Sequence, residues 1–121
     1  MRYLLDTNAV VYCLEGVFPL FERVSIEDEL YISFISRIEL YCGKVDENQE
    51  FMIRRFLNDL TEFDADSGIV ERTIYVRKKY GLKIPDAIIV ATAIEKDMVL
   101  ITADKEILKK VNDIKLIDPL Q

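Results

Sequence analysis

The chain has 121 residues and a net charge of −6, and half of its residues are hydrophobic. This length suits a single domain, 1–121, that can bury a sizeable core. Histidine is absent, which excludes Ser-His-Asp and Cys-His hydrolases, RNA cleavage by paired histidines, and zinc sites built with imidazole. Any catalysis must therefore use carboxylates, Lys, Tyr, Cys or a metal ion held by oxygen ligands.

The expected elements alternate between short apolar strands and helices. In chain order, we expect a strand over 2–5, helices over 7–15 and 17–24, a strand over 30–33, helices over 36–42 and 50–60, a strand over 62–64, helices over 66–80 and 84–96, a strand over 99–101, a helix over 105–111 and a strand over 116–117. The helix over 84–96 is apolar nearly all round, which is typical of a central, buried helix. The pattern predicts a three-layer α/β/α sandwich with a short, mostly parallel central sheet.

The start of the chain contains no membrane or export signal that we recognise. Its apolar stretch is interrupted at Asp6 and is too short for a signal-peptide core, and no apolar run reaches the about 20 residues that cross a bilayer. We therefore expect a cytoplasmic protein that does not contact a membrane. Cys13 and Cys42 are far apart in the sequence and neither stands in a C-x-x-C motif. In a reducing compartment we expect two buried thiols rather than a disulfide.

Four carboxylates stand where the strands are expected to end. Asp6 ends the first strand, Glu39 lies in the first turn after the second, Asp86 opens the buried helix, and Asp104 follows the strand over 99–101. Ligands of open parallel sheets bind beyond the carboxyl ends of the strands. Four acids gathered there cannot all stay ionised without a cation. An all-oxygen cluster suits Mg²⁺ or Mn²⁺ rather than zinc.

Each of these acids also has a purely structural interpretation. Asp6 and Asp104 can cap the helices that follow them, and Ser36 with Glu39 matches a capping box. Asp86 is favoured by the dipole at a helix start. For any one acid the structural interpretation is preferable. For all four at one sheet edge we favour a metal site, because capping does not explain an acid in front of the most buried helix.

Four stretches, in their order and separations, resemble the PIN-domain family, and especially its short VapC-like toxins of toxin–antitoxin pairs. They are Leu5-Asp6-Thr7-Asn8, Ser33-x-x-Ser36-x-x-Glu39-Leu40, Ile84-Pro85-Asp86-Ala87 and Ile101-Thr102-Ala103-Asp104-Lys105. The resemblance spans nearly the whole chain, although 44–66 carries no diagnostic match. Ile107 stands where many relatives carry an aromatic residue, which we expect to affect packing and not chemistry.

The resemblance implies a divalent-metal-dependent endoribonuclease. Asp6, Glu39, Asp86 and Asp104 match the family's acidic positions, with Asp6, Asp86 and Asp104 expected as direct ligands and Glu39 as a ligand or as the group that positions water. Asn8 and Thr102 match the supporting polar positions. From their places beside these acids, Arg37 and Lys105 are our candidates for contacting the RNA substrate.

The resemblance also implies partners. A toxin would be held inactive by a cognate antitoxin laid across the active-site groove, and a homodimer is expected, with the segment 17–24 and the helix 50–60 as possible surfaces. A housekeeping RNA-processing nuclease and a non-catalytic binding module remain alternatives at this point. A phosphotransfer domain is the weakest enzyme alternative, because it would need an Asp-x-Asp pattern where this chain has Asp6-Thr7-Asn8. The net negative charge neither demands nor excludes an RNA substrate.

Overall fold

The computed structural model describes residues 1–121, and its centre is a sheet of five parallel strands. The strands are β1 (Arg2–Leu5), β2 (Glu29–Ser33), β3 (Thr61–Phe63), β4 (Val99–Ile101) and β5 (Leu116–Ile117). Their order across the sheet is β3-β2-β1-β4-β5. The first strand of the chain therefore lies in the middle, and strands far apart in the sequence end side by side at one edge, called here the carboxyl edge.

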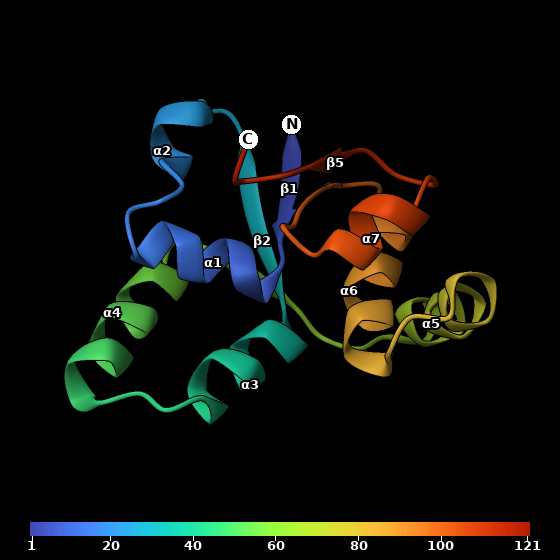
Figure 1. The fold of residues 1–121 in the computed structure, drawn as a ribbon, viewed down its shortest axis with the longest axis horizontal. Coiled ribbons are helices and arrows are strands. Elements are labelled where there is room, and N and C mark those ends of the chain that lie inside the picture. The colour runs from blue at the N-terminus through green and yellow to red at the C-terminus, as the bar shows by residue number, and fades with distance from the viewer.

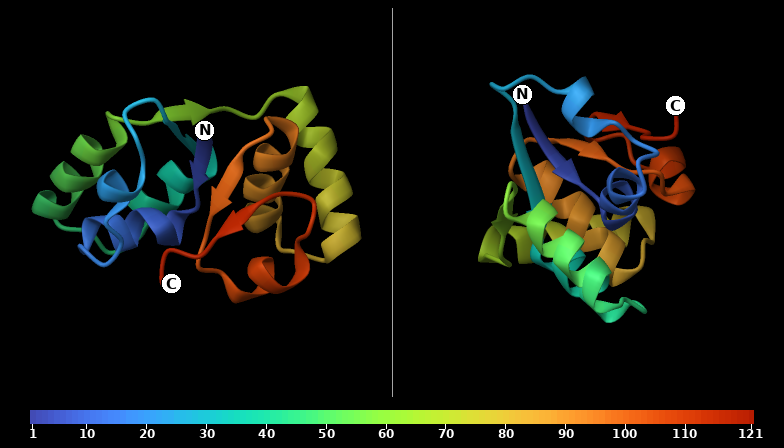
Figure 2. Two further views of the ribbon diagram at one scale, coloured as in Figure 1. Left: turned by 90° about the horizontal axis from the view of Figure 1, so that it is seen from above. Right: turned by 90° about the vertical axis from the view of Figure 1, so that its left-hand side faces the viewer.

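Helices cover both faces of this sheet. They are α1 (Thr7–Leu14), α2 (Leu20–Arg23), α3 (Phe34–Cys42), α4 (Glu47–Leu57), α5 (Ser67–Tyr80), α6 (Ile84–Glu95) and α7 (Lys105–Lys110). Figures 1 and 2 show α1 to α4 gathered on one side of the strands and α5 to α7 on the other. The predicted α/β/α sandwich with a parallel sheet is confirmed.

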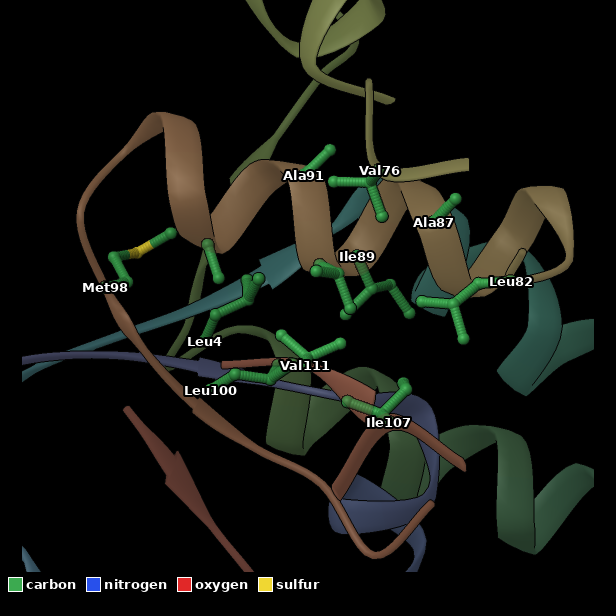
Figure 3. Packing of buried hydrophobic residues seen from close by; sticks show 12 residues of the cluster. Leu4, Val76, Leu82, Ala87, Ile89, Ala91, Met98, Leu100, Ile107 and Val111 are labelled. Atoms are coloured by element: carbon green, nitrogen blue, oxygen red, sulfur yellow. The ribbon is translucent and has the colours of Figure 1, made fainter. Parts of the chain in front are cut away.

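Alternation along each strand divides the core into two layers. Leu4 of β1 and Leu100 of β4 pack with α6, α5 and α7, and Figure 3 shows them facing Ile89 of α6. The next residues, Leu5 and Ile101, point to the opposite face and pack against α1, α3 and α4. Successive side chains of a strand alternate in this way, so strands buried on both faces read as continuous apolar runs.

Local signals set the ends of α5 and α6 where they were predicted. The Asp66 side chain accepts a hydrogen bond from the backbone N–H of Ile69 at 2.8 Å, and Gly81 ends α5 in the left-handed conformation with φ of 69°. Pro85 stands in the first turn of α6, and nearly all faces of this helix are buried, as its apolar sequence predicted.

Three other helix predictions were wrong at their ends. The helix over 17–24 is reduced to Leu20–Arg23, and Pro19 is its N-cap. The helix α3 starts at Phe34, because Ser33 accepts the capping hydrogen bond from Ile35 instead of Ser36. The helix α4 is shifted towards the N-terminus by an Asp46 capping box.

Both cysteines are free thiols, as expected, but only one is sheltered. Burial raises the pKa of Cys13 to about 11, which makes it a poor nucleophile. Cys42 is exposed at the end of α3, so the expectation of two buried thiols was wrong for it. None of the helices is long and apolar enough to span a bilayer.

Candidate active site at the carboxyl edge

Asp6 ends the central strand and is almost completely buried, with 4% of its surface exposed. Its Oδ1 accepts a hydrogen bond from the backbone N–H of Thr7 at 2.7 Å, which makes Asp6 the N-cap of α1. Its Oδ2 accepts from Thr102 Oγ1 at 2.7 Å and from Asn8 Nδ2 at 3.3 Å. Three donors therefore fix the carboxylate in one orientation.

The surroundings of Asp6 disfavour its charge. Burial raises the pKa of Asp6 from 3.8 to about 6, although the hydrogen bonds from Thr102 and Thr7 act in the opposite direction. The charges of Asp86 and Asp104 raise the pKa further. A buried carboxylate whose pKa is raised both by burial and by neighbouring acids is an arrangement that is common at functional sites.

Asp86 is half-buried in the first turn of α6, and no side chain caps this helix. Burial raises its pKa, and the charges of Asp104, Glu39 and Glu106 add to the effect, whereas Lys83 opposes it. Asp86 thus lies within electrostatic range of the other three predicted acids, Asp6, Glu39 and Asp104. Glu106 was not among the predicted acids, and it forms an ion pair with Lys110 at 2.5 Å.

Glu39 reaches the site from α3, which begins directly where β2 ends (Figure 1). Its Oε1 accepts a hydrogen bond from Thr7 Oγ1 at 2.7 Å. The capping box of Ser36 and Glu39 suggested by the sequence is not formed, because Ser36 lies inside α3 and is buried. The carboxylate of Glu39 is therefore directed to the start of α1 and not to its own helix end.

The supporting polar residues join Asp6 to the turn between β4 and α7. Asn8 Oδ1 accepts a hydrogen bond from the backbone N–H of Ala103 at 3.0 Å, and Thr102 Oγ1 accepts one from that of Asp104 at 3.1 Å. Asp104 caps α7, because its Oδ1 accepts from the N–H of Ile107 at 2.9 Å. The second carboxylate oxygen of Asp104 has no hydrogen bond to the protein. Asp104 can therefore cap α7 with one oxygen and still offer the other to a cation.

The chemistry of these donors fits a hard divalent cation. The four acids all offer oxygen, which is the ligand that Mg²⁺ and Mn²⁺ prefer, and burial together with neighbouring negative charge raises the pKa of Asp6 and of Asp86. As the side chains are placed, however, no three acidic or thiol side chains lie close enough together to enclose an ion.

The two candidate substrate contacts differ in their surroundings. Arg37 forms a two-pronged ion pair with Glu62 of the neighbouring β3, with Nε–Oε1 and Nη2–Oε2 distances of 2.6 and 3.1 Å. The guanidinium of Arg37 is thus paired with Glu62, which is not one of the four predicted site acids. Lys105 is exposed and forms no hydrogen bond or ion pair. Lys83 is a further cation near the edge, since its charge acts on both Asp86 and Glu106.

Comparison with known proteins decides the family. The family model described as PIN domain matches residues 3–114. The chain belongs to the PIN domain family. A comparison with curated proteins finds no significant match.

Solved structures of similar fold include PIN-like chains from toxin–antitoxin complexes. The VapBC complex from Salmonella typhimurium, bound to DNA, contains a chain with a TM-score of 0.84 and 20% identity, with 98% of each chain covered. VapBC2 from Rickettsia felis, bound to a promoter fragment, gives 0.83 and 21%, covering 97% of this chain and 98% of the other. A toxin–antitoxin complex from Klebsiella pneumoniae gives 0.78 and 28%, with 97% of each chain covered.

Proposed function

We propose that this chain is a divalent-metal-dependent endoribonuclease and the toxin of a type II toxin–antitoxin pair. The observation that carries the proposal is Asp6, a buried carboxylate with a pKa of about 6 that is repelled by Asp86 and Asp104 at the carboxyl edge. Carboxylates whose pKa is raised by burial and by neighbouring acids cluster at functional sites. Membership of the PIN domain family and the likeness to chains of toxin–antitoxin complexes support the same function.

Each residue of the edge has a part in this mechanism. Asp6, Asp86 and Asp104 would hold the Mg²⁺ or Mn²⁺, and Glu39 would hold the ion or orient the attacking water. When bound, the ion supplies an activated water and neutralises charge that develops on the scissile phosphate. Asn8 and Thr102 keep Asp6 in place through the hydrogen bonds described above. Lys83 and Lys105, which neighbour Asp86 and Asp104 in the sequence, would attract phosphates of the RNA.

Removal of the metal tests this function. Purified protein is incubated with a panel of tRNAs and single-stranded RNAs, with Mg²⁺ or Mn²⁺, with EDTA, and with EDTA followed by excess metal. We expect internal cleavage with the metals, none with EDTA, and recovery with excess metal. Cleavage that persists in EDTA would contradict the metal dependence, and a folded protein that cuts no RNA would favour a binding module.

An apolar groove beside Glu39 supports the antitoxin as partner. The groove has a volume of about 370 Å³, lies between α1, α3 and α4, and has Thr7 and Glu39 at one end. A second hollow of about 280 Å³ shares Leu14 and Met52 with it, so apolar surface continues towards α2. The apolar residues lining the groove are Val11, Leu14, Leu40, Val45, Met52 and Ile53. An apolar segment of the antitoxin laid here would cover Glu39 and block the RNA.

The predicted surfaces for a homodimer fall on this same side of the molecule. Phe21 of α2 and Met52 of α4 line the second hollow. We therefore assign these segments to the antitoxin, and the homodimer implied by the family resemblance would use another surface.

A charge placed in the groove is expected to weaken antitoxin binding. Met52→Asp should weaken the complex with the cognate antitoxin by at least about tenfold, because it puts an unpaired charge into an apolar interface. Ile74→Asp on α5 is the matched control, since both side chains are 46% exposed and only Met52 lines the groove. Equal loss of affinity in both variants, measured by calorimetry, would place the antitoxin elsewhere.

A further inference from the structure

The Thr7 hydroxyl lies between two side chains of α3. Thr7 Oγ1 is 2.7 Å from Glu39 Oε1 and 3.0 Å from Ser36 Oγ. A hydroxyl has one proton to donate, and an ionised carboxylate only accepts. Thr7 therefore donates to Glu39, and the Ser36 hydroxyl donates to Thr7. The result is a chain of two hydrogen bonds that runs from inside α3, through the first residue of α1, to the carboxylate.

This contact is the whole attachment of the Glu39 carboxylate. Glu39 is exposed, forms no ion pair, and has no other hydrogen bond. Ser36, by contrast, is completely buried, so the far end of the hydrogen-bond chain is held by the core. The flexible side chain of Glu39 is in this way held, through Thr7, by a buried residue. The second carboxylate oxygen of Glu39 has no hydrogen-bond partner in the protein.

We propose that Thr7 is a positioning residue which, supported by Ser36, holds Glu39 at the carboxyl edge with one oxygen bound and the other directed to the cation or the attacking water. This inference rests on the proposed function for its chemistry. The hydrogen-bond geometry itself belongs to the free protein and can be tested without metal or RNA.

A plain packing role for Thr7 would give a different outcome from a positioning role. Valine has nearly the shape of threonine and lacks the hydroxyl, whereas serine keeps the hydroxyl and loses only a methyl group. Packing is thus preserved better by Thr7→Val, and positioning by Thr7→Ser. Thr73→Val is the matched control, because the Thr73 hydroxyl donates only to the Ile69 carbonyl oxygen within α5.

The first measurement is a crystal structure of each metal-free variant. We expect the Glu39 carboxylate to keep its place in Thr7→Ser and in Thr73→Val, and to leave it or occupy several rotamers in Thr7→Val. An unchanged Glu39 in Thr7→Val would overturn the inference, whatever the protein does to RNA. If Thr7→Val does not fold, Thr7→Ala removes the same hydroxyl without adding an apolar branch.

The second measurement is Mn²⁺ affinity by calorimetry, followed by kcat and KM for RNA cleavage. Loss of a partner that orients a ligand costs about 10- to 100-fold in metal affinity or activity. We expect a loss of this size in Thr7→Val and less than about threefold in Thr7→Ser. In a Glu39→Ala background Thr7→Val should cost nothing more, since the residue it positions is gone.

Failure of the inference can be told apart from failure of the proposed function. A wild-type protein that binds Mn²⁺ and cuts RNA, with Thr7→Val equally active, would refute the role of Thr7 alone. A loss in Thr7→Val that is equally large in the Glu39→Ala background would also refute it. Wild-type protein that neither binds Mn²⁺ nor cuts RNA would refute the proposed function, while the crystal structures still decide whether Thr7 holds Glu39.

Discussion

The Asp6→Asn variant is expected to lose RNA cleavage by at least about 10²- to 10³-fold, the scale of one strong electrostatic contact in an active site, while keeping its fold. The substitution removes a negative charge and almost no volume. Its amide oxygen can still accept from the N–H of Thr7. The Thr102 hydroxyl can rotate from donating to accepting, because it has two lone pairs.

The loss is measured as the single-turnover rate at which wild type and variant cleave an RNA that is a substrate of the wild type. The control is Glu71→Gln on the exposed surface of α5, which makes the same change of charge away from the carboxyl edge. The control should cleave like the wild type. Equal cleavage by Asp6→Asn would remove Asp6 from the site and, with it, the basis of the proposed mechanism.

The second large effect is on stability in the absence of metal. The pKa of Asp6 is about 6 in the folded protein, against an ordinary value of 3.8. Below about pH 4 the carboxyl is neutral in both states and costs nothing. Between these values the folded state binds more protons than the unfolded state, so its stability falls as the pH rises. Above about pH 6 the cost is complete, and it amounts to at most about 3 kcal/mol.

Urea unfolding in EDTA at several pH values between 4 and 8 measures this cost. Asp6→Asn has no such charge, so the variant should become more stable than the wild type as the pH rises through this window. Added Mn²⁺ should then stabilise the wild type by mass action and the variant much less. If the difference in free energy of unfolding between wild type and Asp6→Asn does not change across this pH window, the charge of Asp6 does not destabilise the folded protein.

Much of the fold followed from local signals that each segment carries by itself. The Asp66 cap, Gly81 and Pro85 mark helix ends by backbone chemistry alone. The start of α3 did not follow, because both Ser33 and Ser36 are good caps and the choice depends on where β2 stops pairing with its neighbours β1 and β3. The start of α3 is therefore set by strand pairing, which the sequence of this segment alone does not indicate.

Some features of the site follow from the topology of the sheet, and others depend on how the helices pack. The placing of Asp6, Asp86 and Asp104 near one edge follows from the rule for parallel strands. The link from Thr7 to Glu39 depends on how α1 lies against α3, and no spacing in the sequence indicates it. Glu106 carried one weak signal, its place in the first turn after Asp104. Arg37 was expected to face RNA, and its pairing with Glu62 became visible only once β3 was placed beside β2.

The central claim is that Asp6, Asp86 and Asp104 at the carboxyl edge hold a catalytic cation, and a crystal grown with Mn²⁺ tests it most directly. Anomalous scattering locates manganese without any assumption about the site. We expect a peak bounded by Asp6 and at least one of Asp86 and Asp104, and its loss in Asp6→Asn. A crystal with millimolar Mn²⁺ that shows no peak at this edge, or a peak only among other residues, would contradict the claim.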